Sequence, residues 1–170
     1  APSFTNTKSI ALDGVDDFVQ LTSTNNLRPT ESELNATGYT VSAWVKRNNS
    51  SYNNIFNNDG VGQSTYYGLS FSVSDTGVLL MSKLDGTGTG SGDRSTAITT
   101  STISSNVWTH VLYAMPSANK STWKIYVNGV SQTLTTKKVV KFQTFSAPGL
   151  IFGYSRRKLW ILHVQICILV

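Results

Sequence analysis

An alternation of apolar and polar residues with a period of two constrains the fold of this chain more than any other feature. It is clear at residues 10–12, 19–21 and 39–45, where every second residue is apolar. Successive side chains of a β-strand point to opposite faces, so this period predicts half-buried strands. The longest such face consists of Tyr39, Val41, Ala43 and Val45. No run of ten or more residues has an apolar stripe at helical spacing, and residues 27–38 are expected to hold at most one short turn of helix. The pattern predicts an all-β protein.

The same alternation predicts further strands, and turn residues connect them. Residues 69–80 are predicted to form a hairpin, because the alternation stops at Ser-Asp-Thr-Gly (74–77) and then resumes. Additional strands are predicted at residues 107–114, 123–127 and 150–152, and Asn128-Gly129 is predicted to be a turn. Two polar segments, 47–54 and 86–93, lack packing residues and are expected to form mobile loops at a rim.

The length of 170 residues and an apolar content of 39% suit one packed domain, predicted to span residues 1–170. Its single cysteine, Cys167, excludes an intrachain disulfide bond. Residues 159–170 are apolar but too few for a membrane-spanning helix, which needs about 20 residues. Because they also alternate, we predict that they form the final strand and pair beside residues 10–12.

The charges are distributed unevenly along the chain. Residues 1–93 hold nine acidic and five basic residues, a net charge of −4, whereas residues 94–170 hold nine basic residues and no acidic one. One interpretation is a scatter of solvated side chains. The other is an anion-binding stripe suited to acidic polysaccharide, formed by Lys137, Lys138, Lys141, Arg156, Arg157 and Lys158. Nucleic acid is not expected as a partner, because no aromatic-interleaved basic motif or helix-turn-helix pattern accompanies the charge.

Five segments carry a family resemblance: SIALDGVDDFVQL, YTVSAWVKRN, NVWTHVLYAM, WKIYVNGV and LIFGYS. In this order they resemble the successive strands of the laminin G-like family over residues 9–154. The resemblance implies a concanavalin A-like jelly roll, a sandwich of two antiparallel sheets. The final strand at 159–170 is atypical, because Leu162 and His163 stand where the family usually has Asp and Glu that help to hold calcium.

Catalysis is not expected. Glycosidases that resemble this fold carry two glutamates along one strand, so that a nucleophile and an acid lie about 5 Å apart. Here the two glutamates, Glu31 and Glu33, fall in a polar segment after Pro29, where solvated charges are the simpler interpretation. His110 is in phase with Trp108 and is expected to be a hydrogen-bonded structural residue.

Calcium is the one cofactor that the sequence suggests. Asp13, Asp16 and Asp17 form the densest acidic cluster and could supply oxygen ligands. The alternative is that these aspartates shape turns by accepting hydrogen bonds from backbone amides. The altered final strand weakens the calcium interpretation.

Glycan binding needs an aromatic face for the sugar ring and polar groups for its hydroxyls. The residues predicted to supply the aromatic face and the polar groups are Tyr52, Asn57, Asp59, Tyr66 and Tyr67. Residues 57–59 are expected to form an oxygen-rich loop. The tryptophans Trp44, Trp108 and Trp123 are expected to lie in the core.

The sequence therefore predicts a non-catalytic carbohydrate-binding or adhesive module, with a glycan or polysaccharide as partner. A structural or assembly domain with protein partners is the alternative, and a degenerate glycosidase is the third interpretation. The expected location is extracellular, on a cell surface or on a virion surface.

Overall fold

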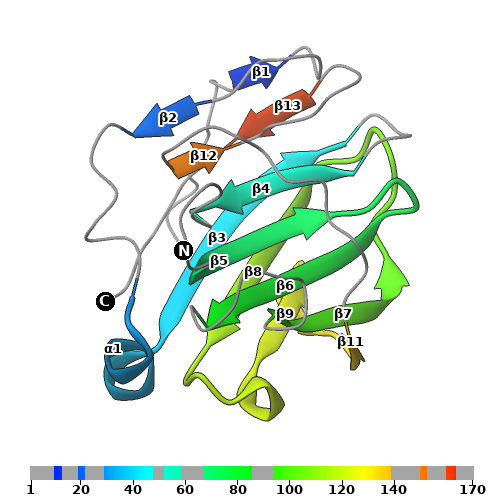
Figure 1. The fold of residues 1–170 in the computed structure, drawn as a ribbon. Coiled ribbons are helices and arrows are strands. Elements are labelled where there is room, and N and C mark those ends of the chain that lie inside the picture. The colour runs from blue at the N-terminus through cyan, green and yellow to red at the C-terminus, as the bar shows by residue number, and fades with distance from the viewer. Residues whose placement is uncertain are drawn as a thin grey trace, which may run out of the picture.

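Two antiparallel sheets lie face to face in the computed structural model, which describes residues 10–12, 19–21, 29–47, 52–58, 67–85, 94–138, 150–152 and 160–163 (Figure 1). Sheet A has the order β1 (Ile10–Leu12), β13 (Trp160–His163), β3 (Tyr39–Lys46), β8 (Thr109–Met115), β9 (Lys124–Val127) and β10 (Val130–Ser131). Sheet B has the order β11 (Leu134–Lys138), β7 (Arg94–Thr102), β6 (Val78–Asp85), β5 (Tyr67–Val73), β4 (Asn53–Asn57), β12 (Leu150–Phe152) and β2 (Val19–Leu21). The predicted all-β sandwich is confirmed.

Strands from the two ends of the sequence meet at one side of the sandwich, the upper side in Figure 1. β13 lies between β1 and β3, with Leu162 opposite Ile10 on one side and opposite Val45 on the other. The predicted pairing of the final strand with the first is thus confirmed for residues 160–162. β12 pairs in the same manner with β2. The remaining residues of the predicted final strand, 164–170, lie outside the described residues.

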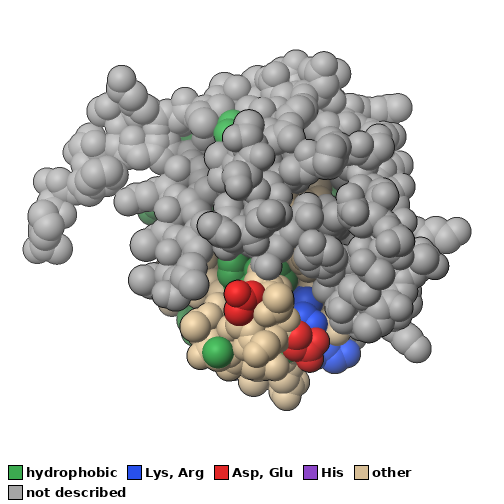
Figure 2. Space-filling model, turned by 60° about the vertical axis from the view of Figure 1, so that its left-hand side comes forward, with side chains coloured by type: hydrophobic (Ala, Val, Ile, Leu, Met, Phe, Trp, Pro, Cys, Tyr) green, Lys and Arg blue, Asp and Glu red, His purple; other side chains and the backbone are tan. Residues whose placement is uncertain are grey.

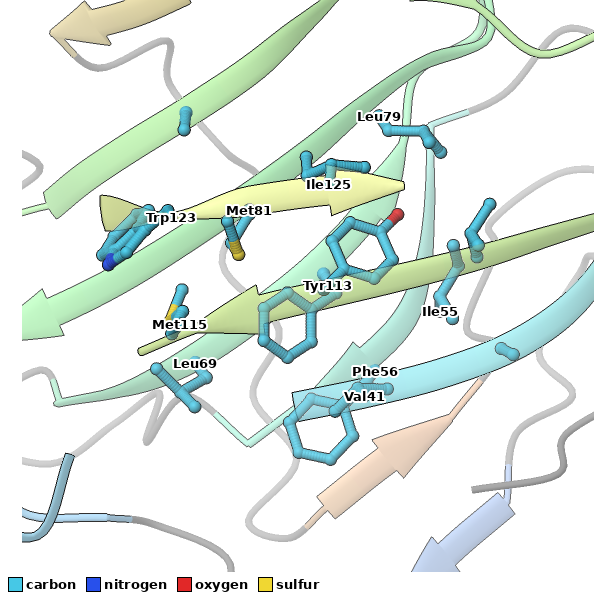
Figure 3. Packing of buried hydrophobic residues seen from close by; sticks show 14 of the residues in the cluster. Val41, Ile55, Phe56, Leu69, Leu79, Met81, Tyr113, Met115, Trp123 and Ile125 are labelled. Atoms are coloured by element: carbon cyan, nitrogen blue, oxygen red, sulfur yellow. The ribbon is translucent and has the colours of Figure 1, made fainter. Parts of the chain in front are cut away.

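The core lies between the sheets and follows the predicted alternation. Alternate residues of β3 and β8 are buried, and Figure 3 shows Val41 and Tyr113 of sheet A directed toward Phe56 and Met81 of sheet B. Phe71 is central, because its ring stacks on Tyr113 at a centroid distance of 4.8 Å and contacts Phe56 at 5.5 Å. Such aromatic pairs stabilise the contact between sheets beyond the burial of area alone.

The segment before β3 is more helical than predicted. The structure has a seven-residue helix, α1 (Glu31–Thr37), where at most one short turn was expected. Thr30 caps it: the Glu33 amide donates to the Thr30 hydroxyl at 3.2 Å, and the Thr30 amide donates to the Glu33 carboxylate at 2.7 Å. These hydrogen bonds satisfy amides that a helix start leaves open, and they lower the pKa of Glu33. Leu34 is fully buried and anchors the helix to the core.

An ion pair ties α1 to sheet B. Lys83 of β6 lies 3.2 Å from a carboxylate oxygen of Glu31. Figure 2 shows acidic side chains beside basic ones at this end of the molecule. Glu31 and Glu33 therefore both have structural partners in the fold.

The expectation of a polar rim loop at 47–54 is wrong at its start. Arg47 is buried, and its guanidinium donates hydrogen bonds to the backbone carbonyls of Ile103 (3.1 Å) and Asp75 (2.8 Å). Burial lowers the pKa of Arg47, while the charge of Asp75 raises it. Arg47 thus follows the end of β3 and joins sheet A to two loops of sheet B.

The expectation is also wrong at the end of that segment. Residues 53 and 54 begin β4, and both asparagine side chains are buried. β4 pairs with β5 and has an irregular register between Asn54 and Phe56. Asparagine has a low intrinsic preference for strands. Pairing with β5 satisfies the backbone hydrogen-bonding groups of this Asn-rich segment and so allows it to form a strand.

Two buried tyrosines predict how stability depends on pH. Burial raises the pKa of Tyr39 and of Tyr113 above the ordinary value near 10. Their phenols therefore lose protons in the unfolded chain first, so stability is intact below about pH 10 and falls as the pH rises further. We expect a loss of about 1.4 kcal/mol per tyrosine and per pH unit above that point.

Urea denaturation between pH 9 and 11.5 tests this pH dependence. Tyr113→Phe should halve the slope of unfolding free energy against pH, although it also removes the hydrogen bond from the Tyr113 hydroxyl to the Ser72 carbonyl (3.2 Å). A free energy of unfolding that stays constant up to pH 11 would contradict the burial of these phenols.

Candidate functional site

The outer face of sheet A presents an exposed tryptophan from β3. The core-facing residues of β3 take the odd positions from Tyr39 to Val45. The even positions Ser42, Trp44 and Lys46 therefore face away from the core. Trp44 is 43% exposed. The expectation that Trp44 belongs to the core is wrong, because Trp44 is out of phase with the apolar face that fills it.

The second tryptophan assigned to the core, Trp108, is also exposed, at 37%. It directly precedes β8, in which Thr109 is buried and His110 lies on the outer face. The third, Trp123, confirms its prediction: it is 2% exposed, and its indole nitrogen donates to the Ser117 carbonyl at 2.9 Å.

His110 lies directly opposite Trp44 in the β3–β8 pairing. Its Nε2 atom forms a 2.7 Å hydrogen bond with the Ser42 hydroxyl, and its ring centroid lies 5.4 Å from that of Trp44. The His110 amide donates to the Asn128 side-chain oxygen at 3.0 Å. The prediction of a hydrogen-bonded histidine is confirmed, and these contacts fix the imidazole beside the indole.

We call Ser42, Trp44, Trp108 and His110 the tryptophan face. Trp108 directly precedes Thr109, which pairs with Val45, so Trp108 lies at the end of the β3–β8 pair that carries Trp44. The face therefore presents two exposed indoles at one end of these strands, with an imidazole and a hydroxyl beside Trp44.

Two of the predicted glycan-binding residues, Tyr52 and Asn57, lie at opposite ends of β4 and face the same serine-bearing side of β5. The Tyr52 hydroxyl hydrogen-bonds to the Ser72 hydroxyl, and Asn57 lies opposite Ser70. Six of the side chains on this polar face are amides or hydroxyls, namely Asn54, Asn57, Ser70, Ser72, Ser82 and Thr96, and Leu80 and Ile98 share the face with them. These six are buried, and the Ser82 and Thr96 hydroxyls hydrogen-bond to each other at 3.0 Å.

The oxygen-rich loop expected at 57–59 is not a loop at its start. Asn57 is the last residue of β4, and the Asn58 side-chain oxygen accepts a hydrogen bond from the Leu69 amide at 2.6 Å. Asp59 and Tyr66 lie outside the described residues. Tyr67 begins β5, and its side chain is outside the description.

The proposed calcium ligands Asp13, Asp16 and Asp17 also lie outside the described residues. In the part of the chain that is described, no group of three or more His, Cys, Asp or Glu residues could hold a metal ion. Calcium binding stays a prediction. Of the basic stripe, Lys137 and Lys138 lie in β11, and the other four residues fall outside the description.

Glu31 and Glu33 do not form the strand-borne pair of a glycosidase of this fold. Both belong to α1, where one pairs with Lys83 and the other caps the helix. Within the described residues, no helix is both long and apolar enough to cross a membrane.

Comparisons with known proteins agree with this architecture. A solved structure titled as the CBM40 of Ruminococcus gnavus IT-sialidase bound to alpha2,3 sialyllactose has a TM-score of 0.53 at 12% identity, covering 93% of this chain and 92% of that one. The carbohydrate-binding module CBM66 from Bacillus subtilis has a TM-score of 0.52 at 11% identity, with coverages of 98% and 94%. A mutant of HCR/D has a TM-score of 0.57 at 16% identity, and the match covers 95% of this chain but only 39% of that longer one.

A search of curated protein sequences finds no match. The sequence of residues 13–160, however, matches the family Laminin_G_3. Together with the two-sheet architecture, this match shows that the chain belongs to the concanavalin A-like lectin/glucanases superfamily.

Proposed function

We propose that this protein is a non-catalytic carbohydrate-binding module that holds its glycan on the tryptophan face. The observation that carries the proposal is the exposure of Trp44 in the middle of a sheet, beside an imidazole that Ser42 holds in place. Exposed apolar surface rimmed by polar groups is typical of a ligand site. An indole stacks on the apolar face of a sugar ring, while neighbouring polar groups bind its hydroxyls.

The similar structures support this proposal. Two of them are titled as carbohydrate-binding modules, and one is titled as bound to sialyllactose. The one bound to sialyllactose places a sugar on a sandwich of similar architecture. The structural roles of Glu31 and Glu33 also favour binding over hydrolysis. A glycan ligand fits a location outside the cell, on a cell surface or on a virion surface.

The second candidate for the glycan site is Tyr52, which is half-buried beside the polar face of sheet B and hydrogen-bonds to Ser72. Asn57 and the four hydroxyl side chains of that face are buried, so among these residues Tyr52 is the one that a sugar could reach. Asp59, Tyr66 and Tyr67 belong to this second proposal through their positions in the sequence. A structural or assembly role is the alternative function, and self-association without glycan binding would support it.

Trp44→Ala is expected to weaken glycan binding by about 10- to 100-fold, because the variant loses the stacking surface. Its melting temperature should change by less than about 3 °C, since most of the indole does not fill the core. The measurement is a glycan array with neutral and acidic sugars, followed by isothermal titration of the best ligand.

Two variants serve as controls for Trp44→Ala. Val130→Ala removes another exposed apolar side chain of sheet A, and it should leave binding unchanged. Tyr52→Phe removes the hydroxyl that contacts Ser72 and tests the polar face. Loss of binding in Tyr52→Phe alone would move the site to sheet B, and wild-type binding by all three variants would overturn both candidates.

A further inference from the structure

A cationic side chain lies at one end of the tryptophan face. Lys46 follows Trp44 by two residues on the outer side of β3, and Trp108 directly precedes Thr109, which pairs with Val45. Lys46 therefore shares the outer face with Trp44 and lies at the same end of the β3–β8 pair as Trp108. In the stretches that the structure describes, the one ion pair joins Glu31 to Lys83, so no described carboxylate neutralises Lys46.

The carboxylates with described side chains lie elsewhere in the molecule. Glu31 and Glu33 belong to α1, which lies before the start of β3, whereas Lys46 is the last residue of β3. Asp75 lies on the turn between β5 and β6 of sheet B, where its carboxylate accepts a hydrogen bond from the Thr76 amide at 2.8 Å. The outer face of sheet A thus combines Lys46, Lys124 and His110 with no described acidic side chain.

We infer that the ligand of the tryptophan face is an anionic glycan, whose ring stacks on Trp44 and whose acidic group binds the ammonium of Lys46. The inference rests on the proposed function and specifies the class of sugar. A neutral sugar would use the indoles and leave the cation without a partner. A carboxylate or a sulfate ester supplies the missing charge, and a charge-assisted hydrogen bond is stronger than a neutral one.

Matched pairs of polysaccharides test the inference, because the members of a pair differ in charge and share a backbone. Polygalacturonate with its methyl ester probes the carboxylate, and dextran sulfate with dextran probes the sulfate ester. We expect the charged member of at least one pair to bind about 10-fold more tightly at 20 mM salt. The difference should shrink at 0.5 M salt, because salt screens an exposed charge pair.

Two lysine variants separate a specific contact from general attraction of a basic protein. Lys46→Gln should weaken binding of the charged polymer about 10-fold and leave the neutral one unchanged, and Lys46→Arg should retain binding. Lys124→Gln removes the same charge from an exposed residue of β9, which pairs with Ala114 of β8. That position is about four residues, or about 13 Å, from Trp44 along the strands. Lys124→Gln should change the affinity less than about 2-fold.

The outcomes distinguish this inference from the proposed function. Equal losses in Lys46→Gln and Lys124→Gln would overturn the anionic contact. Tight binding of the neutral polymers, lost in Trp44→Ala and unaffected by Lys46→Gln, would also overturn it while preserving the tryptophan face. Absence of binding to every polymer would overturn the anionic contact, and absence of binding to every sugar of the glycan array as well would overturn the proposed function.

Discussion

Deletion of residues 159–170 is expected to abolish the cooperative unfolding of this protein. β13 is an interior strand of sheet A, and its removal breaks three register pairs with β1 and three with β3. Each backbone hydrogen bond contributes about 1 kcal/mol, so the total is a large part of the 5–15 kcal/mol that stabilises a domain. Near-ultraviolet circular dichroism and the binding of a hydrophobic dye should show a molten or aggregated chain.

Leu162→Pro tests the same pairing without shortening the chain. Leu162 pairs with Ile10 and Val45, and proline lacks the amide that an interior strand donates. This variant should also lose cooperative melting. A soluble monomer with a sharp transition after either change would show that β13 does not hold sheet A together.

Gly77→Ala is expected to destabilise the protein by about 3–5 kcal/mol. Gly77 has a φ of +93°, and an added Cβ would lie 2.4 Å from the Ile103 carbonyl oxygen and 2.8 Å from the Arg47 guanidinium. The Ile103 carbonyl cannot move freely, because Arg47 donates to it and the Ile103 amide donates to the Gly77 carbonyl. The melting temperature should fall by about 6–20 °C in a chain of this length.

Gly129→Ala provides a matched control, since Gly129 has a φ of +80° but no atom within 4 Å of its added Cβ. Only backbone strain of about 1–2 kcal/mol applies there. Differential scanning calorimetry of the two variants separates the clash from the strain. Equal falls in melting temperature would show that the Arg47 end of the sandwich yields to the added methyl group.

The strands of the sandwich could be predicted because burial follows a period of two that the sequence displays directly. The same period predicts that Trp44 lies outside the core, since Val41, Ala43 and Val45 occupy the opposite face. A general preference of tryptophan for the interior outweighed this evidence. The helix α1 also had a readable signal, because Thr30 and Glu33 have the spacing of a capping box.

Other features depend on contacts between distant residues. Asn53–Asn57 has the composition of a loop and becomes a strand through its pairing with β5. The carbonyl of Ile103, which holds Arg47, is 56 residues away in the sequence. The tryptophan face likewise requires the register of β3 and β8, which brings Ser42 to His110 across 68 residues. Composition and spacing contain no information on that register.

The edges of the two sheets have a consequence for aggregation. In the described part of the chain, the outermost strands are β1 and β10 of sheet A and β2 and β11 of sheet B. The first three have only two or three residues, and the longer β11 ends in Lys137 and Lys138. Short edges and edge lysines oppose the addition of a further strand from another molecule. Growth of cross-β fibrils through these four described edges is therefore disfavoured.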